Sequence, residues 1–391
     1  MDMKTRILFL TILSAVVAQE YSGYHIIETS PVPQDAASTL VQLLQLDPRF
    51  DLLSDPRHDF PVRILTAAEN VHELRFILHR LGLDMTILCS DLEKVIERER
   101  EAIEVVRRVE KLESRAVTFD RYLDLNEIMA YLDELAMTYP NLVTLEDIGV
   151  TYEGRPIRGI RVSNGPGKRT VLMDSGMHAR EWMGHALGLK VINEIVENPE
   201  NAYLIDLLDW MIVPVLNPDG YNFTWTQGRM WRKNRKPNNG SNCVGTDPNR
   251  NFDFHWGAIA SAMSSIGQTG GIALYMATHT YGNVLMYPWD YTYLPAPTKD
   301  DMQTAGDVAA DAIRAINGTN YVVGQGSVIY FIGYATSMDY AYSLGNIPLV
   351  YTWELTAGGS TGFDPPRNEI DPIASEAWEG IKQLSIYAAA H

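Results

Sequence analysis

Positive charge is scarce in this chain of 391 residues, which carries 32 Lys and Arg against 49 Asp and Glu, a net charge of −17. Such an acidic surface argues against nucleic acid or an anionic membrane as a partner and suits a soluble protein. Beyond the N-terminal residues, no apolar stretch reaches the ~20 residues that a membrane-spanning helix needs. The sequence also shows neither an internal repeat nor a low-complexity segment.

Cysteine is almost absent, since only Cys89 and Cys243 occur. The oxidising route of a secreted protein would allow them to pair. However, the two residues fall in different predicted domains, and a disulfide would keep those domains joined after any cleavage between them. We therefore expect two free thiols.

Residues 1–18 predict a secretory signal peptide. Lys4 and Arg6 give a positive start, residues 7–17 are nearly all apolar, and small residues permit cleavage after Ala18. The stretch is too short to span a bilayer stably. We expect a secreted, extracellular protein. Three glycosylation sequons, whose use the sequence leaves open, fit this route: Asn222, Asn239 and Asn317.

Residues 19–90 predict a small α+β domain with the element order βαββαβ, which is typical of a ferredoxin-like sandwich. Strands are expected at 24–28, 50–53, 60–65 and 85–88, and helices at 36–46 and 66–81. We expect the second helix to begin at Thr66, with Glu69 completing a capping box, and to end at Gly82.

Residues 91–115 predict a charged connecting helix. Glu, Arg and Lys crowd its helical pattern, and such a helix is usually a solvated link between domains. Basic residues near its end offer cleavage points to a trypsin-like protease, and Arg115 is the best placed of them.

Residues 116–391 predict an α/β domain with a mixed, mostly parallel sheet flanked by helices, because strand patterns alternate with helical ones. Strands are expected at 143–148, 157–162, 171–173, 211–216, 272–278 and 349–352, and helices at 125–139 and 182–196. Residues 217–220 are expected to form a turn that closes one strand. In such sheets, ligands bind at the carboxyl ends of the strands.

His178 and Glu181 lie three residues apart, between a predicted strand and a predicted helix. At helical spacing the two side chains face the same way, and zinc accepts both imidazole nitrogen and carboxylate oxygen. Alone the pair is a weak signal, since most such pairs are surface or cap residues. His279, at the end of another predicted strand, is the best third ligand. His185 and His255 compete with it, but neither follows an apolar strand.

Glu354 comes directly after the apolar run 347–350. A carboxylate at the end of a buried strand costs free energy unless it is paired or functional. Beside a zinc-bound water it would act as the general base. The alternative interpretation is a salt-bridged structural residue.

Cations gather at residues 229–236 and 249–251 of this acidic chain. A guanidinium group binds a carboxylate through two parallel hydrogen bonds, so a hydrolase that recognises a free carboxylate would need one or two of these arginines. The alternative is a solvated basic loop, which is the interpretation that we favour for Lys233, Arg235 and Lys236.

Together these stretches resemble the secreted zinc metallocarboxypeptidases of the digestive A/B type, which are made as zymogens. The first part of the chain resembles the family's pro-domain. The matching stretches occur in the family's order and span nearly the whole chain after Arg115: His178-Ala179-Arg180-Glu181-Trp182, Asn217-Pro218-Asp219-Gly220, Arg229-Met230-Trp231-Arg232-Lys233, Asp247-Pro248-Asn249-Arg250-Asn251, His279-Thr280-Tyr281 and Glu354-Leu355.

The resemblance implies a role for each matched residue. One Zn²⁺ would be held by His178, Glu181 and His279. Glu354 would be the general base and then the proton donor to the leaving amine, and Arg232 would stabilise the oxyanion. The remaining matched residues would hold the substrate: Arg180, Asn249, Arg250 and Tyr281.

The chain departs from the family pattern in three places. Tyr330 fits the family's mobile tyrosine, although the stretch after it looks one residue longer than usual, and Tyr334 is the alternative. Only 28 residues separate Arg250 from His279. The family has a longer stretch there, with a cysteine that would pair with Cys243, so we expect one face of the sheet to be less covered.

The third departure concerns the pocket for the C-terminal side chain. Met338, which precedes Asp339, suggests aliphatic or aromatic C-terminal residues. Asp290 stands where the family usually has glycine, and its carboxylate would attract Lys or Arg. One buried charge should outweigh one Met, so we expect a preference for basic residues.

The sequence therefore predicts a secreted zinc metallocarboxypeptidase that removes C-terminal residues by attack of a zinc-activated water. Its expected partners are peptide or protein C-termini and an activating trypsin-like protease, with no nucleic acid and no membrane, and we expect a monomer. Two rival hypotheses remain: a zinc amidohydrolase acting on N-acylated amino acids, and a non-catalytic binding protein that kept the scaffold.

Overall fold

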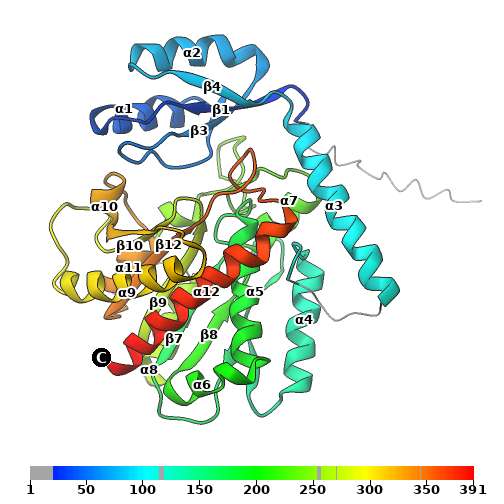
Figure 1. Ribbon diagram of the computed structural model, residues 1–391, viewed down its shortest axis with the longest axis vertical. Coiled ribbons are helices and arrows are strands. Elements are labelled where there is room, and N and C mark those ends of the chain that lie inside the picture. Colours follow the sequence, from blue (N-terminus) through cyan, green and yellow to red (C-terminus); the bar gives the residue numbers. More distant parts are fainter. Residues whose placement is uncertain (1–20, 114–118, 253–256, 270, 344) are drawn as a thin grey trace, which may run out of the picture.

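The computed structural model describes residues 21–113, 119–252, 257–269, 271–343 and 345–391. The predicted signal peptide, Arg115 and His255 lie outside these ranges. Figure 1 shows a small N-terminal α+β unit above a larger α/β unit, with one long helix running down the side of both. None of the helices in the described ranges is long and apolar enough to cross a membrane.

The N-terminal unit has the predicted element order. Its sheet has the strand order β2-β3-β1-β4 and is antiparallel throughout. Ile27 points to the face that the two helices cover, while the adjacent Ile26 points to the opposite face, against the long helix and the larger unit. The elements are β1 (Tyr24–Thr29), α1 (Gln34–Gln45), β2 (Phe50–Leu52), β3 (Arg63–Ala67), α2 (Val71–Arg80) and β4 (Met85–Cys89).

The predicted start of α2 is wrong. Thr66 belongs to β3, and its hydroxyl donates a hydrogen bond to the carbonyl of Arg49 on the neighbouring chain segment. A short 3₁₀ turn, η1 (Ala68–Asn70), then leads into α2, which has no side-chain cap. The hydroxyl that would have capped the helix is used within the sheet, so Thr66 and Glu69 form no capping box.

The connecting helix α3 (Leu92–Glu113) is more than a solvated link. Its apolar side chains Ile96, Ile103 and Val106 are buried. Glu99 forms an ion pair with Arg229 of the larger unit, with 2.6 Å between Oε2 and Nε. The helix is therefore docked along its length rather than surrounded by water.

The larger unit has a mixed eight-stranded sheet in the part of the chain that is described, with strand order β11-β10-β12-β9-β7-β8-β6-β5. The central strands β12, β9, β7 and β8 run parallel, as predicted. The strands are β5 (Val143–Val150), β6 (Pro156–Val162), β7 (Thr170–Ser175), β8 (Asp209–Val213), β9 (Ile272–Thr280), β10 (Val284–Tyr287), β11 (Val322–Gln325) and β12 (Leu349–Leu355). The sequence patterns missed β10 and β11, which have only four residues each.

Helices cover both faces of this sheet (Figure 1). One face packs against α4 (Leu125–Thr138), α5 (Trp182–Val196), α9 (Lys299–Asn317) and α12 (Arg367–Ala390). The other face packs against α8 (Gly257–Thr269) and α11 (Ser337–Ser343). The face that was expected to be less covered is in fact covered by α8, whose buried side chains include Ile259, Met263 and Ile266.

The described residues also contain three short α-helices, α6 (Tyr203–Leu207), α7 (Pro218–Thr226) and α10 (Gly326–Ile329), and two further 3₁₀ turns, η2 (Pro199–Asn201) and η3 (Pro248–Arg250). Residues 217–220 begin α7 and do not form the predicted turn. The Asn217 side chain accepts a hydrogen bond from the amide of Gly220 at 3.0 Å, which satisfies one free amide of the first helical turn. Both cysteines are free thiols, as predicted.

Candidate functional site

His178 and Glu181 lie in the connection between β7 and α5. Glu181 is the N-cap residue of α5, so the pair precedes the helix rather than lying on one of its faces. The side chains of His178 and Glu181 lie close together, as predicted, but a turn before the helix brings them together. Both side chains are buried.

His279 and Glu354 come together because of strand register. His279 is the next-to-last residue of β9, and Glu354 lies opposite it on the parallel neighbour β12. Both lie near the carboxyl ends of their strands, where an α/β sheet places its ligands.

The ligand atoms of His178, Glu181 and His279 converge. The Nδ1 atom of His178 lies 2.8 Å from Glu181 Oε1, and the Nδ1 atom of His279 lies 3.0 Å from Glu181 Oε2. The two Nδ1 atoms are 3.0 Å apart. Among the described residues, this is the one group of three such side chains that could hold a metal ion. Two nitrogens and a carboxylate suit zinc and leave a position open for water or substrate.

Asp247 orients the first of these ligands. Its Oδ1 atom lies 3.0 Å from Nε2 of His178, so that with a cation bound the ring would carry its proton on Nε2 and offer the lone pair of Nδ1 to the cation. His185, a competing candidate, instead bonds through Nδ1 to the carbonyl of Pro214 at 2.9 Å. Burial lowers its pKa to about 4, so it is a neutral core histidine.

The carboxylate of Glu354 lines a cavity of about 760 Å³ beside the metal group. Burial raises its pKa to about 7; the negative charge of Glu181 acts in the same direction, whereas His279 opposes it. No hydrogen bond or ion pair joins this carboxylate to another residue of the described ranges, so it is free to accept a proton from water.

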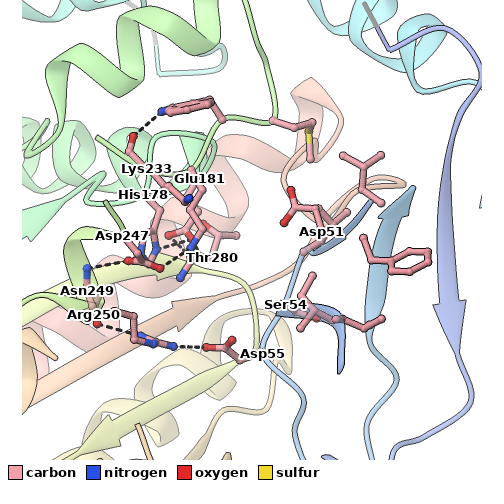
Figure 2. A pocket seen from close by; sticks show the side chains of 18 of the residues that line it. Asp51, Ser54, Asp55, His178, Glu181, Lys233, Asp247, Asn249, Arg250 and Thr280 are labelled. Atoms are coloured by element: carbon pink, nitrogen blue, oxygen red, sulfur yellow. Dashed lines mark hydrogen bonds and ion pairs between the residues drawn. The ribbon is translucent and has the colours of Figure 1, made fainter. Parts of the chain in front are cut away.

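Three more predicted residues line the same cavity, and Figure 2 labels two of them, Asn249 and Arg250. Nη1 of Arg232 lies 3.3 Å from Glu181 Oε1, which places the guanidinium at the metal group. Arg250 donates through Nη1 to the carbonyl of Asn249 at 3.0 Å. Asn249 is fixed in turn, since its Oδ1 accepts the amide of Ser337 at 3.0 Å.

Two aspartates of the N-terminal unit form ion pairs with Arg250 and Arg180. Asp55 Oδ2 lies 2.9 Å from Nη2 of Arg250, and Asp51 Oδ2 lies 2.6 Å from Nη1 of Arg180. Nη2 of Arg180 also donates to the carbonyl of Leu52 at 2.9 Å. Arg180 is completely buried as a result.

The three tyrosines considered for the site differ in their position relative to the cavity. Tyr281 lines the cavity. The guanidinium carbon of Arg63 lies over the ring of Tyr281, 5.6 Å from the ring centroid. Tyr330 also lines the cavity, and its hydroxyl lies beside Gly282 and close to Glu354. Tyr334 is 66% exposed and is not among the residues that line the cavity, so Tyr330 is the better candidate of the two.

The two specificity candidates lie in different environments. Asp290 lines the cavity, and burial, followed by the nearby charge of Asp339, raises its pKa to about 7. Met338 is fully buried in the apolar cluster under α11 and is not among the residues that line the cavity.

Sequence reasoning missed three residues that shape the site. Asp247 lies inside a matched stretch, next to Asn249 and Arg250, and a carboxylate near a histidine ligand could have been suspected there. Asp51 and Asp55 lie in a loop of the N-terminal unit, and a single sequence gives no signal for partners that lie 129 and 195 residues away.

The comparisons with known proteins agree with this geometry. A profile of the zinc carboxypeptidase family matches residues 128–269 and 258–380. Carboxypeptidase A2 of Mus musculus is 30% identical over 416 residues, with 98% of each chain covered, and carboxypeptidase B of Astacus astacus is 33% identical, with 68% of this chain and 96% of that one covered.

A solved structure gives the same result for the fold. Carboxypeptidase A from Helicoverpa armigera superposes with a TM-score of 0.86 at 27% identity, over 95% of this chain and 99% of that one. The match includes the N-terminal unit as well as the larger α/β unit. The chain belongs to the zinc carboxypeptidase family, and it is a metallocarboxypeptidase, a hydrolase of C-terminal peptide bonds.

Proposed function

We propose that this chain is a secreted carboxypeptidase that is made as a zymogen, binds one zinc ion and prefers basic C-terminal residues. The observation that carries this proposal is the convergence of His178, Glu181 and His279 directly beside the carboxylate of Glu354, which has no partner among the described residues. A rival zinc amidohydrolase would not need the arginine cluster at the cavity. A non-catalytic scaffold would not need a free carboxylate there.

The residues around the cavity divide the reaction among them. Arg250 and Asn249 bind the terminal carboxylate of the peptide, and Tyr330 closes the pocket over the last residue. Arg232 stabilises the negative charge that develops on the scissile carbonyl oxygen. Glu354 accepts the proton of the attacking water and then gives it to the leaving amine.

A zinc ion held by His178, Glu181 and His279 would lower the pKa of a water molecule and polarise the scissile carbonyl. The geometry fits this role, since the Nδ1 atoms of the two histidines lie 3.0 Å apart and each lies within 3.0 Å of one carboxylate oxygen of Glu181. Asp247 supports the ligand set through its bond to the far nitrogen of His178.

The contacts of the N-terminal unit support the zymogen proposal. Asp55 lies against Arg250, where the substrate carboxylate would bind, and Asp51 covers Arg180. A peptide cannot pair with these arginines while the aspartates do. Residues 19–90 would thus be a pro-domain and residues 91–115 its connector. Removal would follow cleavage near Arg115 by a trypsin-like protease.

The preference for basic C-terminal residues follows from the cavity wall. The Asp290 carboxylate lines the cavity on the side of Arg250, whereas Met338 does not reach its surface. A substrate held by Arg250 through its carboxylate would point its last side chain toward Asp290. A guanidinium or ammonium group would pair with that carboxylate.

The test is a peptidase assay on the full chain after treatment with trypsin. Matched peptides ending in Arg or in Phe are incubated with and without a zinc chelator, together with an N-acylated amino acid. We expect chelator-sensitive release of one C-terminal residue, fastest from the Arg peptide. Hydrolysis of the acylated amino acid alone would favour the amidohydrolase. No hydrolysis by folded, zinc-loaded protein would favour the scaffold.

Asp55→Asn is expected to raise the activity of the uncut chain about fivefold, because it weakens a half-exposed ion pair worth roughly 1 kcal/mol. The measurement compares peptide hydrolysis by intact protein with hydrolysis after trypsin treatment. Asp84→Asn, at an exposed position of the same unit, is the matched control and should leave the uncut chain as inactive as the wild type. Full activity of the uncut wild-type chain would contradict the zymogen proposal.

A further inference from the structure

A second carboxylate, that of Asp339 in α11, lies next to the backbone of Asp290. The amide of Asp290 donates to both carboxylate oxygens of Asp339, at 3.0 and 3.2 Å, and the amide of Tyr291 donates to one of them at 3.1 Å. Asp339 therefore fixes the backbone from which the Asp290 side chain extends. It also places a second negative charge close to the first.

The Asp290 carboxylate lies against Gly326, the first residue of α10. A Cβ atom at position 326 would lie 1.9 Å from Asp290 Oδ1 and 3.1 Å from Cε of Met338. The first distance is far below any real contact of a Cβ atom. The Asp290 carboxylate can occupy its present position only because residue 326 has no side chain.

The backbone around Gly326 is fixed from both sides. Nε2 of Gln325 donates to the carbonyls of Thr292 and Leu294 at 2.7 and 3.2 Å. The amide of Ser327 donates to the carbonyl of Trp289 at 3.2 Å. A side chain added at 326 would therefore displace the Asp290 carboxylate, since the backbone has little freedom to move.

The groups around Asp290 shift the pKa of its carboxyl group in opposite directions. Burial and the charge of Asp339 raise its pKa to about 7, whereas Arg250 and the hydroxyl of Thr336 lower it. Asp55 also raises it, but this residue belongs to the N-terminal unit and leaves with it. The two largest influences belong to the larger unit and remain. Near neutral pH the carboxyl group is therefore present in both protonation states.

We propose that Gly326 and Asp339 are positioning residues for specificity: they hold Asp290 so that the pocket takes a cationic C-terminal side chain when this carboxylate is ionised and a neutral one when it is protonated. This inference rests on the proposed function, in which Asp290 faces the last side chain of the substrate. The ionised group accepts from a guanidinium, and the protonated group donates its O–H to a neutral acceptor.

The experiment compares two peptides that differ only in their last residue, Arg or citrulline, which have nearly the same shape but different charge. The ratio of kcat/KM for Arg to kcat/KM for citrulline is measured with the trypsin-treated chain from pH 5 to pH 8.5. Titration of Glu354 affects both peptides alike and cancels in the ratio. Burial raises the pKa of Asp290 to about 7, so the ratio should rise at least about tenfold with pH.

Three variants test which residues set this behaviour. Asp290→Asn should give a low ratio that does not change with pH. Gly326→Ala should lower the ratio at pH 8.5 at least about tenfold, because the carboxylate is displaced, while citrulline release stays within about threefold of the wild type. Gly324→Ala is the matched control, since its Cβ would meet only the side chain of Ile329, at 3.2 Å, and should leave the ratio unchanged.

Asp339→Asn should move the midpoint of the ratio to lower pH. The charge of Asp339 raises the pKa of Asp290, so removing that charge makes Asp290 ionise at lower pH. A purely structural role of Asp339 would reduce both rates without this directional shift. An unmoved midpoint, or one moved to higher pH, would contradict the role assigned to Asp339.

The outcomes also separate this inference from the proposed function. A ratio that rises with pH in the wild type and is flat in Asp290→Asn supports the inference. The ratio could instead be high at every pH in the wild type and be lowered equally at every pH by Asp290→Asn. That result would keep the preference for basic residues but overturn the proposed change of preference with pH. A ratio near one that no variant changes would overturn both. Release of no residue from either peptide would overturn the proposed function and this inference with it.

Discussion

Glu354→Gln is expected to lower kcat about a thousandfold, with a much smaller change in KM. General acid–base catalysis by a positioned side chain contributes roughly 10²–10⁴ to the rate, and Glu354 is the carboxylate that lies beside the metal group and free of any partner in the described ranges. In the proposed mechanism, substrate binding depends instead on Arg250 and Asn249. The measurement is a full kinetic analysis of the trypsin-treated variant on an Arg peptide.

The matched control is Glu376→Gln in α12. Glu376 is a buried glutamate that accepts hydrogen bonds from Asn317, Thr319 and Thr356, away from the cavity. Its replacement should reduce stability and leave kcat nearly unchanged. If Glu354→Gln kept more than about a tenth of the wild-type kcat, with one zinc ion bound per chain, another group would have to be the base.

Glu354→Gln is also expected to change the stability of the chain, because burial raises the pKa of Glu354 from its ordinary value of about 4.5 to about 7. The folded metal-free chain then holds this proton more tightly than the unfolded chain. Stability is lost as pH rises from about 4.5 to 7, by up to about 3 kcal/mol. Metal-free Glu354→Gln should therefore be more stable than the wild type at pH 8 and similar to it at pH 4.

The sequence predicts well those features that local pattern controls. The apolar runs of β7, β9 and β12 are long and uninterrupted, so their strands and the residues at their ends were found. The pairing of His279 with Glu354 follows from parallel neighbours of similar length. Short strands such as β10 give too few residues for a pattern to emerge.

Local pattern fails where a tertiary contact uses the group on which a prediction depends. Thr66 has the sequence context of a helix cap, yet its hydroxyl bonds to the carbonyl of Arg49 within the small unit. The 217–220 stretch looks like a turn, yet its asparagine begins α7. The Asp51–Arg180 and Asp55–Arg250 pairs join two units of the fold, and no local sequence pattern predicts them.

The short stretch between Arg250 and His279 shows how a fold tolerates a change in length. We expected one face of the sheet to be less covered because this stretch is shorter than in the family. In the structure, α8 lies on that face, and the sheet residues Leu172 and Met211 remain fully buried. The 13-residue helix α8, which has an apolar side, buries this region together with α11.

His279→Ala is expected to abolish activity and to weaken zinc binding about a hundredfold. Four-ligand zinc sites bind with roughly 10–16 kcal/mol, or about 3 kcal/mol for each ligand, and this corresponds to about two powers of ten in affinity. The remaining pair, His178 and Glu181, cannot enclose the cation alone. Zinc content after dialysis at a fixed free zinc concentration, together with peptide hydrolysis, measures both effects.

His185→Ala provides the matched control, because both histidines are about 1% exposed and both substitutions leave a cavity of similar size. The His185 ring bonds to a backbone carbonyl and not to the metal group, so this variant should lose stability but keep its zinc. A ligand that binds only the folded chain raises its melting temperature. Added zinc should therefore raise the melting temperature of His185→Ala as much as that of the wild type, and that of His279→Ala much less. Equal loss of zinc from both variants would show that the ion depends on the packing of this region rather than on His279 as a ligand.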